Sequence, residues 1–111
     1  MSEEQNEISV YQSRRFEKAL QKLPEVELSL VEDEIDRIIA NPELGVQKKG
    51  DLSHLWVHKF KLSSKQILLG YTWVENKLEL YLLNIGSHEN YYQEMKKNRK
   101  VDLKIINRWG Q

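Results

Sequence analysis

Hydrophobic residues follow two different spacings along the chain, and the change comes near its middle. The first part opens with a short alternating segment, 8–11, which predicts a strand. Ser13 is a suitable N-cap for a first helix, which Pro24 would end. Apolar residues then recur every three or four positions over 25–40, which predicts a second, amphipathic helix ahead of a loop over 44–51.

Beyond this loop the apolar residues alternate with polar ones. This pattern predicts three strands, over 52–62, 67–74 and 78–85. A Gly-Ser pair ends the last strand, and 88–97 predicts a short helix. The tail, 98–111, is basic but keeps apolar residues whose spacing allows either a last helix or a docked extended segment.

The predicted order is β-α-α-β-β-β-α, which is typical of a small α+β domain. It has an N-terminal strand, two helices, a three-stranded antiparallel meander packed on the helices, and a C-terminal helix or tail. We expect the helices on one face of the sheet, and we expect the first strand to join the meander, because an isolated strand would leave its backbone groups unpaired. The length of 111 residues suits one domain, 1–111, with a flexible N-terminus over 1–7 and a C-terminal extension over 98–111.

Composition narrows the class of protein. The chain has 17 basic and 17 acidic residues, but the charge is uneven, with a net −6 over 1–45 and +6 over 46–111. This division either creates a basic face for a phosphate backbone or reflects acid-rich helices and Lys-rich strands. The absence of Cys excludes disulfides and a Cys nucleophile. No apolar run is long enough for a membrane span and the N-terminus is polar and acidic, so we expect a cytoplasmic protein without a membrane partner.

The three His residues all lie in the basic half of the chain. Strand alternation puts His58 and Trp56 on one face, with Lys59 and Lys61 on the other. The two Lys either line a ligand surface or form an ordinary solvated face. His88 would open a helix after Gly-Ser, where it could move a proton or be an exposed first-turn residue.

Other chemistry is weakly indicated. His54 is more simply explained as a residue at the rim of the core than as a functional group. The His spacing matches no metal-binding motif, and there is no Gly-rich phosphate loop, so neither a metal nor a cofactor is expected. Trp56, Tyr91 and Tyr92 could stack on bases, although core packing is the commoner use of aromatic residues.

The element order and four segments together resemble the RelE/ParE superfamily of bacterial type II toxins. The segments are Arg14–Leu23, Gly50–Leu62, Gln66–Tyr71 and Leu82–Tyr92, within a match over about 8–97. The resemblance implies the RelE-like fold. RelE-type members are metal-independent ribonucleases that cut messenger RNA on the ribosome, where the 2′-OH attacks its own phosphate.

The resemblance also implies roles for individual residues. His88 falls where RelE has a catalytic Arg and the YafQ-like branch a catalytic His, so it would act as general acid or base. Lys59 and Lys61 lie where RelE proteins carry a Lys pair that stabilises the phosphate or acts on the nucleophile. Tyr92 would stack on or orient the nucleotide, and His58 would be a second proton carrier. Because His58 and Lys59 point to opposite faces, we prefer the lysines.

Further RNA contacts are expected from basic and aromatic side chains. These are Lys48, Lys49, Lys65, Trp56, Tyr91, Lys96 and Lys97. Tyr71 matches the aromatic that closes the next strand, and Leu68 occupies a position that usually holds a phosphate-binding Arg. The implied partners are a cognate antitoxin and messenger RNA on the ribosome. Two alternatives remain: a ParE-like inhibitor of DNA gyrase, and a degenerate member that only binds.

Overall fold

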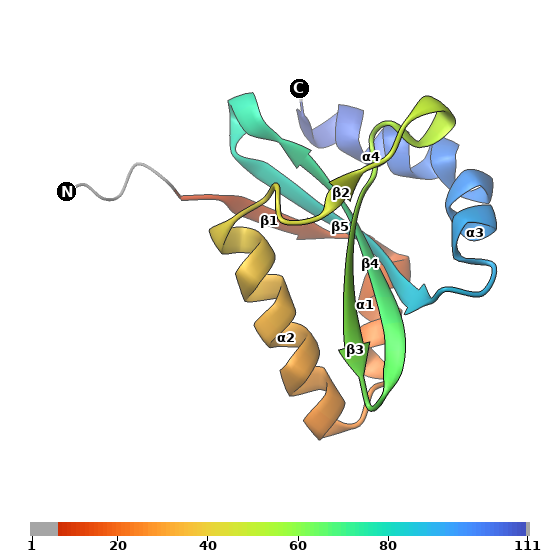
Figure 1. Ribbon diagram of the computed structural model, residues 1–111. Coiled ribbons are helices and arrows are strands. Elements are labelled where there is room, and N and C mark those ends of the chain that lie inside the picture. Colours follow the sequence, from red (N-terminus) through yellow and green to blue (C-terminus); the bar gives the residue numbers. More distant parts are fainter. Residues whose placement is uncertain (1–6, 111) are drawn as a thin grey trace.

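The computed structural model describes residues 7–110, which form one five-stranded sheet with helices on both faces (Figure 1). The strands are β1 (Ser9–Gln12), β2 (Val46–Gln47), β3 (Trp56–Leu62), β4 (Lys65–Val74) and β5 (Glu79–Ser87). The helices are α1 (Arg14–Gln21), α2 (Glu25–Ala40), α3 (Tyr91–Lys97) and α4 (Arg99–Gly110), with short 3-10 turns η2 (Gly50–Leu52) and η3 (Glu75–Lys77). The predicted α+β fold class is confirmed.

The strands lie in the order β1-β5-β4-β3-β2. The antiparallel meander of β3, β4 and β5 forms the centre, as the sequence predicts. β1 joins it as expected, and it runs parallel to β5 with Ser9 opposite Glu79 and Gln12 opposite Leu82. Between β4 and β5 the register shifts, because Gly70 pairs with Asn84 whereas Tyr71 pairs with Leu82. The extra residue on β5 is a β-bulge at the centre of the sheet.

Helices cover both faces of the sheet, which corrects the expectation of a single covered face. One core cluster includes Phe16 of α1 and Ile38 of α2, and the opposite cluster includes Tyr91 and Met95 of α3. Figure 1 shows α2 on one side of the strands and α3 and α4 on the other. The physical reason is a run of apolar residues on consecutive positions, Leu80–Leu83, because neighbouring residues on a strand point to opposite faces and both must be buried.

Local chemistry accounts for the N-terminal helices. Ser13 caps α1 as predicted, with its hydroxyl accepting from the backbone N–H of Phe16 at 3.0 Å. The same hydroxyl donates to the carbonyl of Leu83 at 2.6 Å, which ties the start of α1 to β5. Pro24 is the N-cap of α2, and this helix ends before Asn41.

Several boundaries differ from the prediction. β3 begins at Trp56, because η2 and a turn occupy the first residues of the segment predicted as a strand. Within the predicted loop over 44–51, two residues form β2 and pair with Trp56 and Val57. The short helix begins at Tyr91, three residues later than expected. The tail forms the helix α4, which is one of the two structures that its spacing allows.

The prediction of a flexible segment over 1–7 falls mainly on residues 1–6, which lie outside the described residues. In the described part of the chain, no helix has the length and apolar character needed to cross a membrane.

Candidate functional site

Two exposed lysines lie on the sheet face that carries α3 and α4. Lys59 and Lys61 are exposed, and they alternate along β3 with side chains that point to the other face. Lys59 pairs with Leu68, which is fully buried in the cluster beneath α3 and α4, and directly opposed residues share a face. The predicted separation of these lysines from His58 is therefore confirmed.

His88 lies in the loop between β5 and α3, and it does not open the helix as the sequence suggested. Asn90 takes the N-cap position with a left-handed backbone, φ 60°, which separates His88 from the first turn. Asn tolerates this conformation better than most residues, and this position is what delays the helix until Tyr91. The imidazole of His88 is exposed and meets the Tyr92 ring edge-on, with centroids 6.2 Å apart and planes at 79°.

Tyr92 joins His88 to a basic side chain from another part of the chain. The ammonium of Lys48, next to β2, lies 5.1 Å from the centroid of the Tyr92 ring. This is within cation–π range. We call these three residues the Lys48–Tyr92–His88 cluster. It brings together three of the predicted site residues, with a charge on one side of the aromatic ring and an imidazole at its edge.

The lysines of β3 lie beside this cluster. Lys59 pairs with Leu68 and Leu68 pairs with Gly86, so the three residues form one row across β3, β4 and β5. Adjacent strands are about 4.8 Å apart, which places the Cα atoms of Lys59 and Gly86 about 10 Å from each other. His88 follows Gly86 by two residues. The Lys59 and Lys61 side chains and the cluster thus border one surface.

His58 and Trp56 are not part of this surface. His58 is 8% exposed on the α2 side, and its Nε2 lies 2.7 Å from Oε1 of Glu34 in α2. Trp56 stacks on Tyr71 at 6.3 Å on the same side. Tyr71 itself is fully buried, and its hydroxyl donates to the Pro42 carbonyl at 2.7 Å. These residues join the sheet to α2 and to the loop that follows it.

Tyr91 lies in the core and leaves no ring face for a base. Its side chain is 3% exposed, and its hydroxyl donates to the carbonyl of Asn84 at 3.2 Å. Burial raises the pKa of the Tyr91 phenol far above its usual range, so the group stays neutral. The ring covers Gly70, where a Cβ atom would overlap the hydroxyl of Tyr91.

The remaining predicted RNA contacts are exposed lysines outside the cluster. These are Lys49, Lys65, Lys96 and Lys97. Leu68, which occupies the usual position of a phosphate-binding Arg, is fully buried under α3 and α4.

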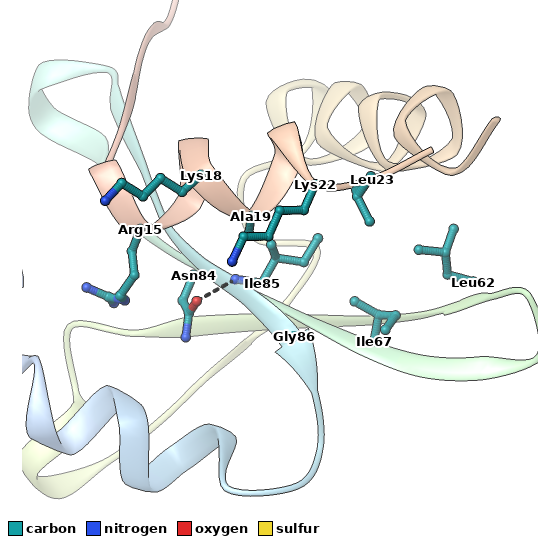
Figure 2. Close-up of a pocket in the computed structure, with 10 residues that line it drawn as sticks. All are labelled: Arg15, Lys18, Ala19, Lys22, Leu23, Leu62, Ile67, Asn84, Ile85 and Gly86. Atoms are coloured by element: carbon teal, nitrogen blue, oxygen red, sulfur yellow. Dashed lines mark hydrogen bonds between the residues drawn. The ribbon is translucent and has the colours of Figure 1, made fainter. Parts of the chain in front are cut away.

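Sequence reasoning missed two features. Arg15 of α1 forms two hydrogen bonds with the buried Asp102 of α4, and no local pattern indicates a pair of residues 87 apart. A groove of about 440 Å³ also lies between α1 and the strands, as Figure 2 shows. Its basic side chains, Arg15, Lys18 and Lys22, recur at helical spacing, and that spacing is the signal that could have revealed the groove.

No group of three or more His, Asp or Glu side chains within residues 7–110 is arranged to hold a metal ion.

Three solved structures are similar to this chain in fold. A double mutant of Escherichia coli toxin RelE in the free state is 16% identical, with a TM-score of 0.64 over 85% of this chain and 97% of that chain. A chain of the intact E. coli RelBE toxin-antitoxin complex is 18% identical, with a TM-score of 0.60 over 75% of this chain and 99% of that chain. A chain of the archaeal RelE–RelB complex from Pyrococcus horikoshii is 17% identical, with a TM-score of 0.54 over 74% of this chain and 96% of that chain. No curated protein matches the chain.

A family model decides the affiliation. The model for the ParE-like toxin of type II bacterial toxin-antitoxin systems matches residues 10–96. This match spans β1 to α3 and therefore most of the fold. The chain belongs to the RelE/ParE family and is a toxin of a type II toxin-antitoxin system.

Proposed function

We propose that this toxin is a metal-independent endoribonuclease that cleaves messenger RNA on the ribosome and is neutralised by a cognate antitoxin. The observation that carries the proposal is the Lys48–Tyr92–His88 cluster beside Lys59 and Lys61. The cluster combines a proton carrier, an aromatic ring and several cations, which are the groups that cleavage by a neighbouring 2′-OH requires.

Each residue has a distinct part in the proposed reaction. The 2′-oxygen of one nucleotide loses its proton to a base and forms a bond to the adjacent phosphorus. The bond from this phosphorus to the 5′-oxygen of the next nucleotide breaks, and that oxygen receives a proton from an acid. The products are a 2′,3′-cyclic phosphate and a free 5′-OH. His88 takes or supplies one of these protons, because its imidazole is exposed and its ring nitrogens can accept or donate a proton. Lys59 and Lys61 stabilise the negative charge that develops on the phosphate oxygens.

Tyr92 positions the substrate in this proposal. Its ring holds a nucleotide base or keeps the imidazole of His88 in place through the edge-on contact. Lys48 contributes a charge above the ring and attracts the RNA backbone. His58 has no part in the reaction, because it faces α2 and contacts Glu34.

Primer extension on cellular messenger RNA, shortly after induction of the toxin alone, tests the proposal. We expect new 5′ ends inside translated codons with the wild-type protein and none with His88→Ala. A general acid or base usually contributes about 10²–10⁴-fold to the rate, so the variant should be nearly inactive. Lys59→Ala with Lys61→Ala should also weaken cleavage strongly.

Lys77→Ala provides the matched control, because Lys77 is an exposed lysine in η3, outside the cluster. It should cleave like the wild type. Cleavage by His88→Ala at the wild-type rate would remove His88 from the site, and unchanged cleavage by the double Lys variant would remove the lysines.

A second candidate function is inhibition of DNA gyrase. The description of the matching family as ParE-like and the buried Leu68 at the phosphate-binding position both favour it. This candidate predicts intact messages, arrested growth and a DNA-damage response on induction. Inhibition of supercoiling by purified gyrase would support it. Intact messages with normal growth would indicate a member that only binds.

A further inference from the structure

Lys48 is held firmly at the edge of the sheet. Its backbone N–H donates to the carbonyl of Leu55 at 2.8 Å, which continues the pairing of Gln47 with Trp56 by one residue. Directly opposed residues share a face of a sheet, so Lys48 lies on the face of Leu55, which is fully buried beneath α3 and α4. The Lys48 side chain is half-buried, whereas that of its neighbour Lys49 is exposed.

The loop ahead of Lys48 is fixed to the sheet. The hydroxyl of Tyr71 accepts from the backbone N–H of Gly45 at 2.9 Å and donates to the carbonyl of Pro42 at 2.7 Å. The loop lies directly on β3, because a Cβ atom at Gly45 would come within 2.7 Å of the carbonyl oxygen of Val57. A side chain on a fixed backbone is suited to orient a reactive group, and Lys48 extends from such a backbone.

The imidazole of His88 lacks such support from its own segment. It is exposed in the loop between β5 and α3, and within residues 7–110 the structure shows no hydrogen bond to its ring nitrogens. Its ring meets that of Tyr92 edge-on. Exposed side chains change rotamer within picoseconds to nanoseconds, whereas a general acid or base must lie within hydrogen-bond reach of the proton that it moves. A neighbour that restrains the imidazole would therefore raise the rate of a reaction at this site.

Tyr92 connects the fixed lysine to the imidazole. The ammonium of Lys48 lies 5.1 Å from the centroid of the Tyr92 ring, and the centroid of the His88 ring lies 6.2 Å from it. Tyr91 meets the same ring at 5.4 Å, with the two planes at 83°. A cation is attracted by the negative face of an aromatic ring, so Lys48 opposes movement of the Tyr92 ring out of this position. A continuous series of contacts thus runs from the edge of the sheet to His88.

We propose that Lys48 is a positioning residue, which holds the Tyr92 ring by its cation–π contact and, through this ring, keeps the imidazole of His88 in one orientation. The inference rests on the proposed function only in giving His88 a proton to move. It adds a role to the attraction that Lys48 exerts on RNA. That attraction needs only an exposed charge, as Lys49 provides, and no contact with a ring.

Nuclear magnetic resonance of the full-length protein with ¹³C-labelled histidine tests the orientation of the imidazole without RNA. The measured quantity is the chemical shift of the Cε1–H proton of His88, which the ring current of Tyr92 displaces. All spectra are recorded at about pH 8.5, well above the ordinary pKa of imidazole, so that differences in protonation do not contribute. Tyr92→Leu removes the ring current and gives the shift of an unrestrained imidazole, and His88→Gln assigns the signal.

Lys48→Met removes the ammonium but keeps most of the aliphatic stem. We expect it to move the His88 signal from its wild-type position towards that of Tyr92→Leu. The same change in the Tyr92→Leu background should move the signal no further, because Lys48 acts through the ring. Lys48→Arg should keep the wild-type signal, since a guanidinium also binds over an aromatic face. Lys49→Met, the matched control, removes the same charge one residue away and should leave the signal in place.

Cleavage of messenger RNA bound to purified ribosomes gives a kinetic readout of the same variants. Lys48→Met should lower kcat about tenfold with a smaller change in KM, because a displaced general acid or base slows the chemical step. Lys48→Arg should restore kcat. Lys49→Met should chiefly raise KM, because it removes a charge that attracts RNA.

Three outcomes would overturn the proposal. Lys48→Met could leave the His88 signal at its wild-type position. It could move the signal equally far in the Tyr92→Leu background, which would show that Lys48 does not act through the ring. It could raise KM with kcat unchanged, which would leave Lys48 only its attraction for RNA. A wild-type protein that cleaves no RNA would refute the proposed function instead, and the two spectroscopic outcomes would still decide whether Lys48 positions the imidazole.

Discussion

The guanidinium of Arg15 holds the carboxylate of Asp102 in two hydrogen bonds of 3.2 and 3.1 Å, which connects α1 to α4. The two ends of this pair differ in burial, because the Asp102 side chain is fully buried whereas that of Arg15 is 25% exposed. The difference matters because a buried charge that loses its partner is far more costly than one that can reach water.

The asymmetry gives the first prediction. Arg15→Met should lower the free energy of unfolding by about 3–5 kcal/mol, because it leaves the Asp102 carboxylate buried without its partner. Asp102→Asn should lower the free energy of unfolding by less, since the guanidinium of Arg15 can turn to water. Urea unfolding measures the free energy of unfolding of both variants. An equal decrease in the two would show that burial of the remaining partner does not determine the destabilisation. The double variant should lose less free energy of unfolding than the two single variants lose together.

The second prediction concerns the pH dependence of stability. Burial lowers the pKa of His54 below its ordinary value of 6.5, and Arg99 adds to this while Asp102 opposes it. The unfolded chain therefore binds more protons than the folded one as pH falls through about 6.5. The free energy of unfolding is thus higher above this pH and decreases below it. His54→Gln, which does not titrate, should lose less stability between pH 7.5 and 5.5 than the wild type. Urea unfolding at the two pH values measures the difference, and an equal loss would contradict it.

The third prediction separates two histidines by function. His58→Gln should keep RNA cleavage close to the wild-type rate, because His58 faces α2 and contacts Glu34 at 2.7 Å. It should lower stability by about 1–2 kcal/mol through the weakened hydrogen bond. Primer extension and urea unfolding of the same variant test both parts. Loss of cleavage in a protein of unchanged stability would return His58 to the site.

The fourth prediction concerns the contact between β4 and α3. Gly70→Ala should destabilise the protein by about 1–3 kcal/mol, because the new methyl group would overlap the Tyr91 hydroxyl and approach Cδ1 of Leu55 to 2.9 Å. Tyr91→Phe removes the hydroxyl, so Gly70→Ala should cost less in that background. Thermal unfolding of the four proteins gives the coupling between the two positions. Independent effects would show that another neighbour limits the space at Gly70.

Local chemistry could be predicted from the sequence wherever neighbours decide it. The N-cap at Ser13 needs only a hydroxyl ahead of a helical pattern, and the structure confirms it. The period of two along β3 correctly put Lys59 and His58 on opposite faces. The second covered face was missed, although consecutive apolar residues over Leu80–Leu83 carried the signal.

Long-range relations could not be predicted in the same way. The contact of Lys48 with Tyr92 depends on how the loop before η2 meets α3, and nothing in either segment specifies the other. The late start of α3 follows from a left-handed Asn90, a conformation that Asn tolerates but does not require. The roles of the site residues remain predictions that the proposed assays test.

The parallel pairing of β1 with β5 has a consequence for how the chain is made. Ser9 pairs with Glu79, so the N-terminal strand finds its place only when a partner 70 residues later has been synthesised. Closing so long a loop is slow, and a chain still emerging from the ribosome holds Ser9–Gln12 without a neighbour. The row of Lys59, Leu68 and Gly86 is likewise incomplete until β5 has emerged. Synthesis of most of the chain thus precedes assembly of the sheet face that bears these residues.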